Sequence, residues 1–469
     1  MGKTTGFMEY TRIENPYRDT ESRLTDFNDL HAALSVDDRK RQASRCMNCG
    51  VPFCQSDYGC PLHNLIPEWN DLLWRGNEHA ALLRLLQTAP FPEFTGRVCP
   101  ALCEKACNLA DDGVTNRDNE LYLIETGYEK GWIQPRRITV HSGKRTAVIG
   151  SGPSGLAAAD LLNRMGHEVT VFEREDRPGG LLMYGIPNMK LPKEVIFRRI
   201  NIMREEGIHF LLNTEAEPEK LDDFDAVLFC GGAKQPRRLN VENDTVPGVH
   251  FAVEFLTAAT KAVLGKQDPT ISASGKSVII VGGGDTGNDC AGTVLRQGCS
   301  SVIQLEMMPC PPENRISSNP WPEWPRTLRT DYGQMEAIAR QGADPRIYET
   351  TIKQIITNDA GTISAVETVR LKRTPEGRFE QVPGTEKTLP CDLLLIAAGF
   401  TGCEKSTAEA FNINLDQRGN MMPKDRTHHL KDHFFSAGDM RTGQSLVVRA
   451  LADGRAAAME IHAWLSREK

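Results

Sequence analysis

The stretch Thr146–Glu173, "TAVIGSGPSGLAAADLLNRMGHEVTVFE", decides the fold that the sequence predicts. Its apolar start, which ends at Ile149, is typical of a buried strand, and the glycine turn after it leads into a helix-like run of alanine and leucine. The apolar residues before Glu173 predict a second strand. A strand, a helix and a strand in this order form a βαβ unit with parallel strands. The sequence therefore predicts an α/β fold built on a parallel sheet.

The glycine turn has the pattern G-x-G-x-x-G, which is typical of a dinucleotide-binding site. Its first glycine permits a tight turn, its second lets a pyrophosphate approach the backbone, and its third lets the helix pack closely on the strand. The start of the helix adds free N–H groups and a partial positive charge. Glu173 ends the second strand, where its carboxylate can accept a hydrogen bond from a ribose 2′-OH. The candidate contacts are Gly150, Gly152, Pro153, Ser154, Gly155 and Glu173.

A second unit with the same logic starts at Lys276 with "KSVIIVGGGDTGNDCAGTVLRQG". Glu306 ends its second strand, and a carboxylate there favours NADH because it would repel the 2′-phosphate of NADPH. The alternative for Glu306 is a solvated carboxylate at a strand end. The residues that open the helix could contact the nucleotide or act as helix caps. The candidate contacts are Gly282, Gly283, Gly284, Asp285, Thr286, Gly287, Asn288 and Glu306.

Two dinucleotide sites on one chain have a chemical use, because a nicotinamide delivers a hydride that a flavin can accept and release as single electrons. We therefore expect FAD in one unit and NAD(P)H in the other. Three stretches assign FAD to the first unit: "RPGGLLMYGIPNMKLPKE" (177–194), "FCGGA" (229–233) and "SAGDMRTGQSLVVRALADGRAAA" (436–458). Asp439 stands between an apolar strand and a helix, which places it to bind a flavin ribityl hydroxyl, although Gly-Asp alone is an ordinary turn pair. Further candidate FAD contacts are Gly180, Leu181, Gly438, Ser445 and Leu446.

Seven of the 13 cysteines crowd into two groups, "CMNCGVPFCQSDYGC" (46–60) and "CPALCEKAC" (99–107). Disulfide scaffolds are short secreted chains, and this chain is long and starts without an apolar signal core, so we expect metal or cluster ligation in a reducing cytoplasm. Seven thiols are too many for one four-ligand centre and one too few for two. Zinc fits a CxxC pair and would make a zinc-stabilised docking module, but zinc is redox-inert. Iron–sulfur clusters suit a chain that converts a hydride into single electrons.

Composition and charge exclude several classes of partner. At 469 residues with a net charge of −7, the chain is not expected to bind nucleic acid. No apolar run reaches the length needed to cross a bilayer, so no membrane contact is expected. The N-terminus also lacks the myristoylation pattern. We expect a cytoplasmic protein of two or three domains.

Five motifs together resemble one family over essentially the whole chain. They are "CMNCGVPFC", "FPEFTGRVCPALCEKACNL", "GGLLMYGIPNMKLPK", "VGGGDTGNDC" and "NPWPEWPRTLRTDYGQ". The chain resembles the small (β) subunits of bacterial glutamate synthase. More broadly it is similar to the FAD-dependent pyridine nucleotide-disulfide oxidoreductases related to the N-terminal half of dihydropyrimidine dehydrogenase.

The resemblance implies two Rossmann-like domains of the glutathione-reductase type, preceded by an α-helical iron–sulfur domain. Residues 1–140 would hold two 4Fe-4S clusters, residues 145–240 and 392–469 would form the FAD domain, and residues 241–391 would form an inserted NAD(P)H domain. Lys190 matches a basic position that contacts FAD in relatives, and its alternative is a surface lysine.

The resemblance also implies that the ligand sets cross between the two cysteine groups. One cluster would be held by Cys46, Cys49, Cys54 and Cys107. The other would be held by Cys60, Cys99, Cys103 and, as an oxygen ligand, Glu120. His63 as the eighth ligand, and a Glu120 that merely faces solvent on a helix, are the alternatives. The chain departs from the family in one spacing, because five residues separate Cys54 from Cys60 where relatives often have three.

The implied function is that of an electron-input subunit in a hetero-oligomer. NAD(P)H would reduce FAD, and the clusters would carry electrons to the large (α) subunit, which makes L-glutamate from L-glutamine and 2-oxoglutarate. We assign no general acid or base, because hydride transfer to flavin does not require one. A thioredoxin-reductase-like enzyme is one rival, but it needs a CxxC pair near the flavin. Another rival is the pyridine-nucleotide subunit of a transhydrogenase, a hydrogenase or dihydropyrimidine dehydrogenase.

Overall fold

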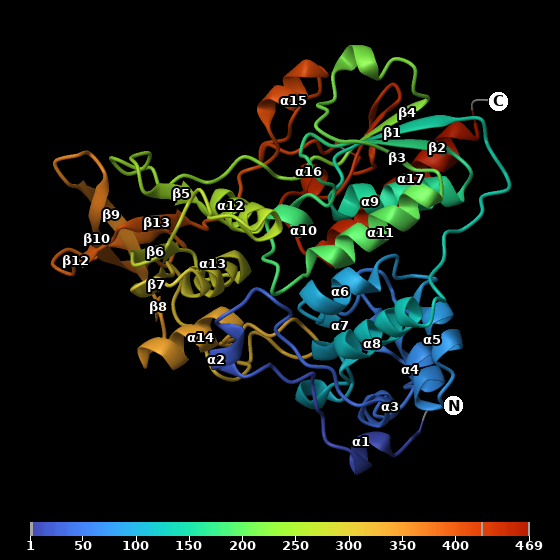
Figure 1. The fold of residues 1–469 in the computed structure, drawn as a ribbon, viewed down its shortest axis with the longest axis horizontal. Helices are drawn as coiled ribbons and strands as arrows, with labels where there is room; N and C mark the ends of the chain where they lie inside the picture. The colour runs from blue at the N-terminus through green and yellow to red at the C-terminus, as the bar shows by residue number, and fades with distance from the viewer. Residues whose placement is uncertain (1–2, 424, 468–469) are drawn as a thin grey trace.

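The computed structural model describes residues 3–423 and 425–467, and it arranges them as a helical N-terminal region beside two parallel sheets (Figure 1). The helices of the N-terminal region are α1 (Gly6–Glu9), α2 (Thr20–Arg23), α3 (Val36–Ser44), α4 (Ile66–Trp74), α5 (Glu78–Leu85), α6 (Pro92–Val98), α7 (Leu102–Lys105) and α8 (Asn116–Glu129). Single 3₁₀ turns occur at Phe53–Gln55 and Ala110–Asp112.

Capping residues and prolines mark the starts of several of these helices. Ser35 caps α3 by accepting a hydrogen bond from the Asp38 N–H (3.1 Å). Pro92 is the first residue of α6. Proline has no N–H, and at this position the N–H would have no partner within the helix. The helical periodicity predicted between the two cysteine groups is confirmed by α4 and α5, which bury Trp69 and Leu82. The cysteines themselves lie mostly in the loops that these helices hold together.

The first sheet carries the βαβ unit that the sequence predicts. Its strands run in the order β14-β15-β4-β1-β2-β3, and every pair is parallel except β14 with β15. The strands are β1 (Arg145–Ile149), β2 (Glu168–Phe172), β3 (His209–Leu211), β4 (Ala226–Phe229), β14 (His429–Lys431) and β15 (Phe434–Ser436). The associated helices are α9 (Pro153–Arg164), α10 (Leu181–Tyr184), α11 (Lys193–Glu205), α15 (Lys405–Ala410), α16 (Asp439–Thr442) and α17 (Val447–Leu465), with a 3₁₀ turn at Pro218–Lys220.

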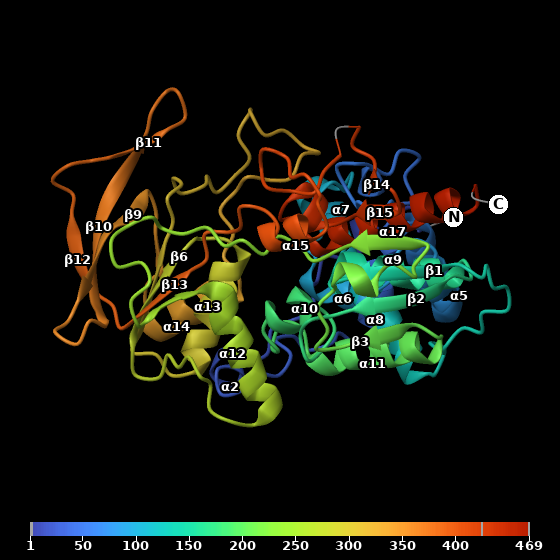
Figure 2. The same cartoon turned by 90° about the horizontal axis from the view of Figure 1, so that it is seen from above.

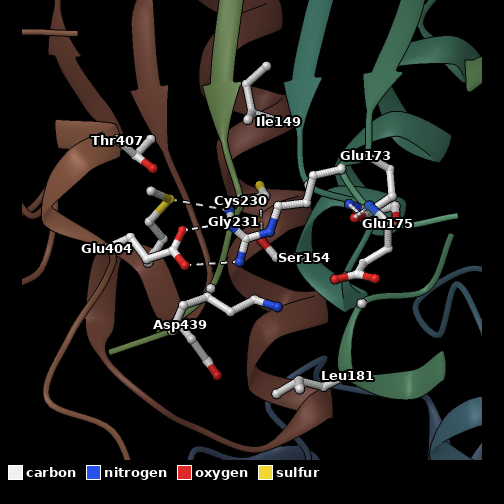
Figure 3. Close-up of a pocket in the computed structure, with 18 of the residues that line it drawn as sticks. Ile149, Ser154, Glu173, Glu175, Leu181, Cys230, Gly231, Glu404, Thr407 and Asp439 are labelled. Carbon is white, nitrogen blue, oxygen red and sulfur yellow. Dashed lines mark hydrogen bonds and ion pairs between the residues drawn. The ribbon is translucent and has the colours of Figure 1, made fainter. Parts of the chain in front are cut away.

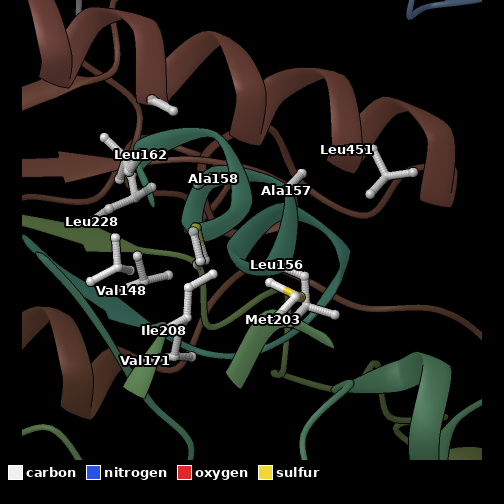
Figure 4. Packing of buried hydrophobic residues seen from close by; sticks show 14 of the residues in the cluster. Val148, Leu156, Ala157, Ala158, Leu162, Val171, Met203, Ile208, Leu228 and Leu451 are labelled. Atoms are coloured by element: carbon white, nitrogen blue, oxygen red, sulfur yellow. The ribbon is translucent and has the colours of Figure 1, made fainter. Parts of the chain in front are cut away.

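The core of this region packs α9 against the sheet and against α17, which also contacts the sheet (Figure 4). Val148 and Leu228 on the sheet meet Leu156 on α9, and Leu451 on α17 packs against the same cluster. Each of these side chains is fully buried or nearly so, which stabilises the fold by about 1.5–3 kcal/mol per side chain. The packing thereby sets the N-terminus of α9 directly beyond the end of β1.

The second sheet is parallel throughout and runs in the order β5-β13-β6-β7-β8. Its strands are β5 (Val249–Phe251), β6 (Ser277–Val281), β7 (Ser301–Leu305), β8 (Arg346–Ile347) and β13 (Leu393–Ile396), and its helices are α12 (Ala252–Gly265), α13 (Asp285–Arg296) and α14 (Tyr332–Gln341). An antiparallel sheet projects from its far side (Figure 2). That sheet consists of β9 (Thr350–Thr357), β10 (Ile363–Arg373), β11 (Phe379–Gln381) and β12 (Lys387–Pro390). The predicted fold class is confirmed.

One expected boundary is wrong. We expected residues 392–469 to return to the first sheet, but β13 pairs with β5 and β6 of the second sheet. The apolar run "LLLI" is buried on both faces, so its composition alone cannot say which parallel sheet it joins. The crossing back to the first sheet therefore follows Ile396.

The N-terminal region also reaches the second sheet. Arg23, at the end of α2, donates to the buried carboxylate of Glu336 on α14 (2.6 Å). Arg296 on α13 pairs with the same carboxylate at 2.6 Å and 3.0 Å. A buried carboxylate is stable only when it is paired, so this cluster ties α2, α13 and α14 together. Within the described residues, no helix has both the length and the apolar character needed to span a membrane.

Candidate functional site

A cavity of about 480 Å³ opens at the carboxyl end of β1, a volume typical of small-molecule and cofactor sites (Figure 3). Ten of the residues that the sequence predicted as FAD contacts line it. They are Gly150, Gly152, Pro153, Ser154, Glu173, Gly180, Leu181, Asp439, Ser445 and Leu446. Figure 3 shows Glu173 and Glu175 on one side of the cavity and Asp439 and Leu181 towards its other end.

The glycine turn fits a pyrophosphate. A side chain added at Gly152 would meet no atom within 4 Å, so its face is open to the cavity. A Cβ at Gly155 would instead lie 2.0 Å from the Gly150 carbonyl oxygen. Gly155 therefore does not line the cavity but lets α9 pack closely on β1, as the fingerprint requires.

The two acidic strand-end residues hold their glycine turns in the same way. The Ser151 N–H donates to Glu173 Oε2 (3.1 Å), and the Glu175 N–H donates to Oε1 (2.9 Å). In the second sheet the Gly283 N–H donates to Glu306 Oε2 (2.8 Å), and the Met308 N–H donates to Oε1 (2.9 Å). The second unit thus repeats the first in hydrogen bonding as well as in sequence. For Glu306, the alternative of a freely solvated carboxylate is wrong.

The second glycine turn also fits a dinucleotide. Gly282 has φ +124°, and a Cβ at Gly284 would meet nothing within 4 Å. Asp285 and Thr286 are exposed at the start of α13, and neither side chain caps the helix. Asn288 differs from the expectation that it faces the nucleotide. It is buried, its Oδ1 accepts hydrogen bonds at the start of α14, and its Nδ2 has no partner among the residues that the structure describes.

Lys190 does not line the flavin cavity, so its expected contact with FAD is not found, and it is not a surface lysine either. Its Nζ donates to Asp289 on α13 (2.9 Å). The Tyr332 hydroxyl donates to the same carboxylate oxygen (2.9 Å). The charge of the lysine is matched within the protein, because Asp289 offers a buried carboxylate at the junction of the two sheets. Lys190 thus joins the loop before α11 to α13 and α14.

Sequence reasoning missed three groups at the cavity. Arg174 and Glu404 both line it and form a bidentate ion pair at 2.7 Å and 3.0 Å. Lys234 lines it as well, and burial lowers the pKa of its ammonium group. The available signal was the position of Arg174 next to Glu173 and of Lys234 directly after "FCGGA", whereas Glu404 had no such signal.

Asp453 and Gly454 on α17 contact the backbone of two segments at the cavity, the turn at Gly438 and the start of α9. The Gly438 N–H donates to Asp453 Oδ2 (2.7 Å), which holds the turn that presents Asp439. A Cβ at Gly454 would lie 2.1 Å from the Ser154 carbonyl oxygen, so α17 touches the first turn of α9. Gly438 itself does not line the cavity, but it leaves room for Ser154.

Lys193 holds the segment that faces the cavity. Its side chain is fully buried, and its Nζ donates to the carbonyl oxygens of Leu182 (2.8 Å) and Ile186 (2.6 Å). Both of these residues line the cavity. Burial lowers the pKa of Lys193 to about 7, because the carboxylates of Asp289 and Glu194 offset only part of the loss of water.

Replacing Lys193 with methionine should change how stability depends on pH. The pKa of Lys193 is about 7 in the folded chain and 10.5 ordinarily, so between these values the unfolded chain binds the extra proton. The wild type should gain stability over the variant as pH rises through this range, by up to about 1.4 kcal/mol per pH unit. Denaturant midpoints across the range measure the trend. The same replacement at the exposed Lys220 should show no trend, and equal trends in both variants would contradict the assignment.

The crossed set of cysteines lines a small cavity in the N-terminal region. Cys46, Cys49, Cys54 and Cys107 all face it, although Cys107 belongs to the second group in sequence. Burial and the neighbouring thiols raise the pKa of Cys46 to about 12. Cys54 is buried and the other three are partly buried, and thiols that share one cavity require a partner for their charge when they ionise, which a metal cluster supplies.

The remaining three cysteines gather around Glu120 on α8. The carboxylate of Glu120 raises the pKa values of the Cys60 and Cys99 thiols beyond the effect of burial. Burial raises the pKa of Glu120 itself to about 8. The Ala101 N–H donates to Cys99 Sγ (3.4 Å), a bond typical of cluster-ligand sulfurs.

The exposure of Glu120 and of His63 separates the candidates for the eighth ligand. Glu120 is only 8% exposed, so the alternative that it faces solvent is wrong. His63 is 62% exposed at its side chain, and its Nδ1 lies 2.8 Å from the Gln55 carbonyl oxygen. His63 is thus turned towards solvent and the Gln55 backbone, whereas Glu120 is buried close enough to Cys60, Cys99 and Cys103 to raise the pKa of each thiol.

One apolar cluster connects the region of the thiols to the flavin cavity. Leu446 lines the cavity and also packs against the apolar cluster that contains Cys54 and Cys60. Among the described residues that line the cavity, Cys230 is the one cysteine, so the CxxC pair of a thioredoxin-reductase-like enzyme is not found there.

Comparison with known families matches both parts of the chain. Residues 144–454 match the family described as pyridine nucleotide-disulphide oxidoreductase, and residues 23–132 match dihydropyrimidine dehydrogenase domain II, 4Fe-4S cluster. The solved structure of FprA from Mycobacterium tuberculosis in complex with NADPH covers 69% of this chain and 85% of its own, with a TM-score of 0.53 at 16% identity. That likeness concerns the fold.

Two relatives are similar over nearly the whole chain. The glutamate synthase (NADPH) small chain of Bacillus subtilis (strain 168) is 45% identical, with 99% of each chain covered. The glutamate synthase (NADH) of Schizosaccharomyces pombe is also 45% identical over 98% of this chain, but the match is 23% of that protein. The chain therefore spans nearly all of the bacterial relative and about a quarter of the yeast one.

Proposed function

This chain belongs to the glutamate synthase small-chain family of pyridine nucleotide-disulphide oxidoreductases, and from that premise we propose that it is the electron-input subunit of a glutamate synthase. It oxidises NAD(P)H and passes the electrons to a large subunit, which makes L-glutamate from L-glutamine and 2-oxoglutarate. FAD, a pyridine nucleotide and 4Fe-4S clusters are its cofactors. The yeast relative supports the partner, because the matching region there is 23% of a longer chain.

The observation that carries the proposal is that one apolar cluster connects the cysteines of the N-terminal region to the flavin cavity. Leu446 faces the cavity on one side, and the apolar cluster on its other side includes Cys60 and, at its margin, Cys99 and Cys103. A disulfide reductase has no use for a seven-thiol region there, and a zinc-stabilised docking module has no need to adjoin a flavin.

We assign the sites as follows. The first sheet holds FAD and the second holds NAD(P)H. One cluster has the ligands Cys46, Cys49, Cys54 and Cys107, and the other has Cys60, Cys99, Cys103 and Glu120. The burial of Glu120, and the effect of its carboxylate on the pKa values of Cys60, Cys99 and Cys103, support its role as the eighth ligand.

The protein's own contribution is to bind, orient and exclude water. When bound, the cofactors convert a two-electron hydride into single electrons that leave one at a time. The open face of Gly152 and the free N–H groups of α9 receive the pyrophosphate. Asp439 is within hydrogen-bonding distance of Ser445 (2.7 Å) and offers its carboxylate to a ribityl hydroxyl. Lys193 keeps the segment facing the flavin in shape.

Glu306 should make NADH the preferred donor. Its carboxylate is fixed beside the glycine turn by two backbone N–H groups, so a 2′-phosphate would approach a negative charge that cannot turn away. A repulsion of about 1.4–2.7 kcal/mol is equivalent to a kcat/KM for NADH that exceeds that for NADPH by roughly 10–100-fold, and this is the ratio we expect. Glu306→Gln should reduce the ratio of kcat/KM for NADH to kcat/KM for NADPH. Glu313→Gln, an exposed acid in the following loop, should leave it unchanged. A wild-type preference for NADPH would contradict the assignment.

Copurification from the native source tests the function as a whole. The chain should bring down a large subunit, and the complex should oxidise NAD(P)H only when both glutamine and 2-oxoglutarate are present. The isolated chain should still reduce an artificial dye with NAD(P)H. A complex with a transhydrogenase or hydrogenase subunit, and no response to glutamine, would favour the rival electron-input role.

A further inference from the structure

A segment of the second-sheet region reaches across to the first thiol set. Residues 306–331 connect β7 to α14 and contain "NPWPEWPRTLRTD" (319–331), a stretch with no role in the site described above. The Trp321 Nε1–H donates to the carbonyl oxygen of Cys107 (3.0 Å). The ring of Trp321 also packs on Phe53, with centroids 4.9 Å apart. Phe53 and Cys107 both line the cavity of the first thiol set.

The segment is built to present this tryptophan. Asn319 is buried, and its Nδ2 donates to Glu323 Oε2 (3.1 Å) and to the Trp324 carbonyl oxygen (3.0 Å), while its Oδ1 accepts from the Arg326 N–H (2.7 Å). Further back, Arg315 donates to the carbonyl oxygen of Glu323 (2.8 Å). A loop held by its own polar core keeps its tip in one place, so Trp321 is positioned rather than simply exposed.

Trp321 is not needed to hold the local backbone. The Cys107 carbonyl oxygen also accepts the Ala110 N–H (2.8 Å), so that turn closes without the indole. What Trp321 adds is a second donor on the backbone of a thiol residue and an aromatic cover over Phe53. Both features act on a cluster's environment, because hydrogen bonding and solvent exposure around the ligands tune its reduction potential.

We propose that Trp321 is a positioning residue for the cluster held by Cys46, Cys49, Cys54 and Cys107, and that it keeps that cluster's reduction potential low by excluding water. The inference rests on the proposed function, since it assumes a cluster at those four thiols. One-electron reduction by an added chemical reductant makes the cluster and its thiolates more negative by one charge. Water stabilises the more highly charged form, so removing the cover shifts the potential in the positive direction.

The test is a redox titration of the full chain, with its clusters and FAD, followed by electron paramagnetic resonance. Trp321→Ala should shift the midpoint of the first cluster positively and leave the second cluster in place. Trp321→Phe keeps the ring but loses the N–H, so it should give a smaller shift and an altered signal from the first cluster. Trp324→Phe, in the same loop, should change neither cluster.

The outcomes separate this inference from the function on which it rests. Loss of the first cluster alone from Trp321→Ala would overturn the inference, because Trp321 would then be needed to hold the cluster rather than to set its potential. Equal shifts in both clusters, or none in either Trp321 variant, would overturn it. A wild type without 4Fe-4S signals would instead overturn the proposed function.

Discussion

Cys54→Ser combined with Cys107→Ser will remove about half of the iron from the purified chain, whereas Cys103→Ser combined with Cys107→Ser will remove nearly all of it. The reason is that Cys54 and Cys107 line one cavity, although they lie in different cysteine groups. Cys103 and Cys107 are close in sequence but belong to different sets, because the Cys103 thiol interacts with Cys60, Cys99 and Glu120. Each cluster requires all four of its ligands, so one lost set costs one cluster.

Iron and acid-labile sulfide per chain, together with the spectrum of the reduced protein, measure this outcome. Cys310→Ser is the matched control, because Cys310 is an exposed thiol outside both sets. If each cluster used one cysteine group alone, the result would reverse, and the Cys54/Cys107 pair would remove all of the iron. That reversal would refute the crossed assignment.

Gly152→Ala should yield a folded chain with both clusters and little FAD. The added methyl group meets no protein atom, so the fold tolerates it, but it occupies the face where a pyrophosphate would approach the backbone. We expect FAD affinity to fall by about 100-fold, equivalent to about 2.7 kcal/mol. Flavin per chain and a fluorescence titration of the apoprotein with FAD measure the loss.

Two neighbouring variants make this result specific. Gly284→Ala has the same open surroundings at the second turn, so it should keep FAD and raise the KM for the pyridine nucleotide. Gly155→Ala places a methyl group 2.0 Å from a carbonyl oxygen, so it should destabilise the fold by about 1–3 kcal/mol or more. A Gly152→Ala chain that binds FAD normally would show that the cavity receives its ligand differently.

The parts of the fold that follow a local period could be predicted from the sequence. The strand-turn-helix units at Gly150 and Gly282 are each encoded by one continuous stretch of sequence. The strand-end acids Glu173 and Glu306, which bind the turns, follow within the same stretches. The strand at 393–396 was harder to assign. Its apolar run is equally suited to either parallel sheet, and its choice depends on contacts with β5 and β6 that no local pattern encodes.

The parts of the site that depend on partners distant in sequence could not be predicted from the residues alone. Lys190 looked like a cofactor contact, but its charge is matched by Asp289, about a hundred positions away. Asn288 opens a helix at a nucleotide turn, yet its oxygen is used by the start of α14. Trp321 stood out only as part of a family motif, because its contact with Cys107 joins two regions that share no sequence pattern.

The interleaving of the chain sets an order for biosynthesis. The second thiol set is complete once Glu120 has left the ribosome, whereas the first set waits for Trp321 to cover it. The flavin pocket waits longer still, because β15 must pair with β4, and Asp453 on α17 must hold the turn before Asp439. We therefore expect the thiol sites to become able to bind iron before the flavin pocket can bind FAD.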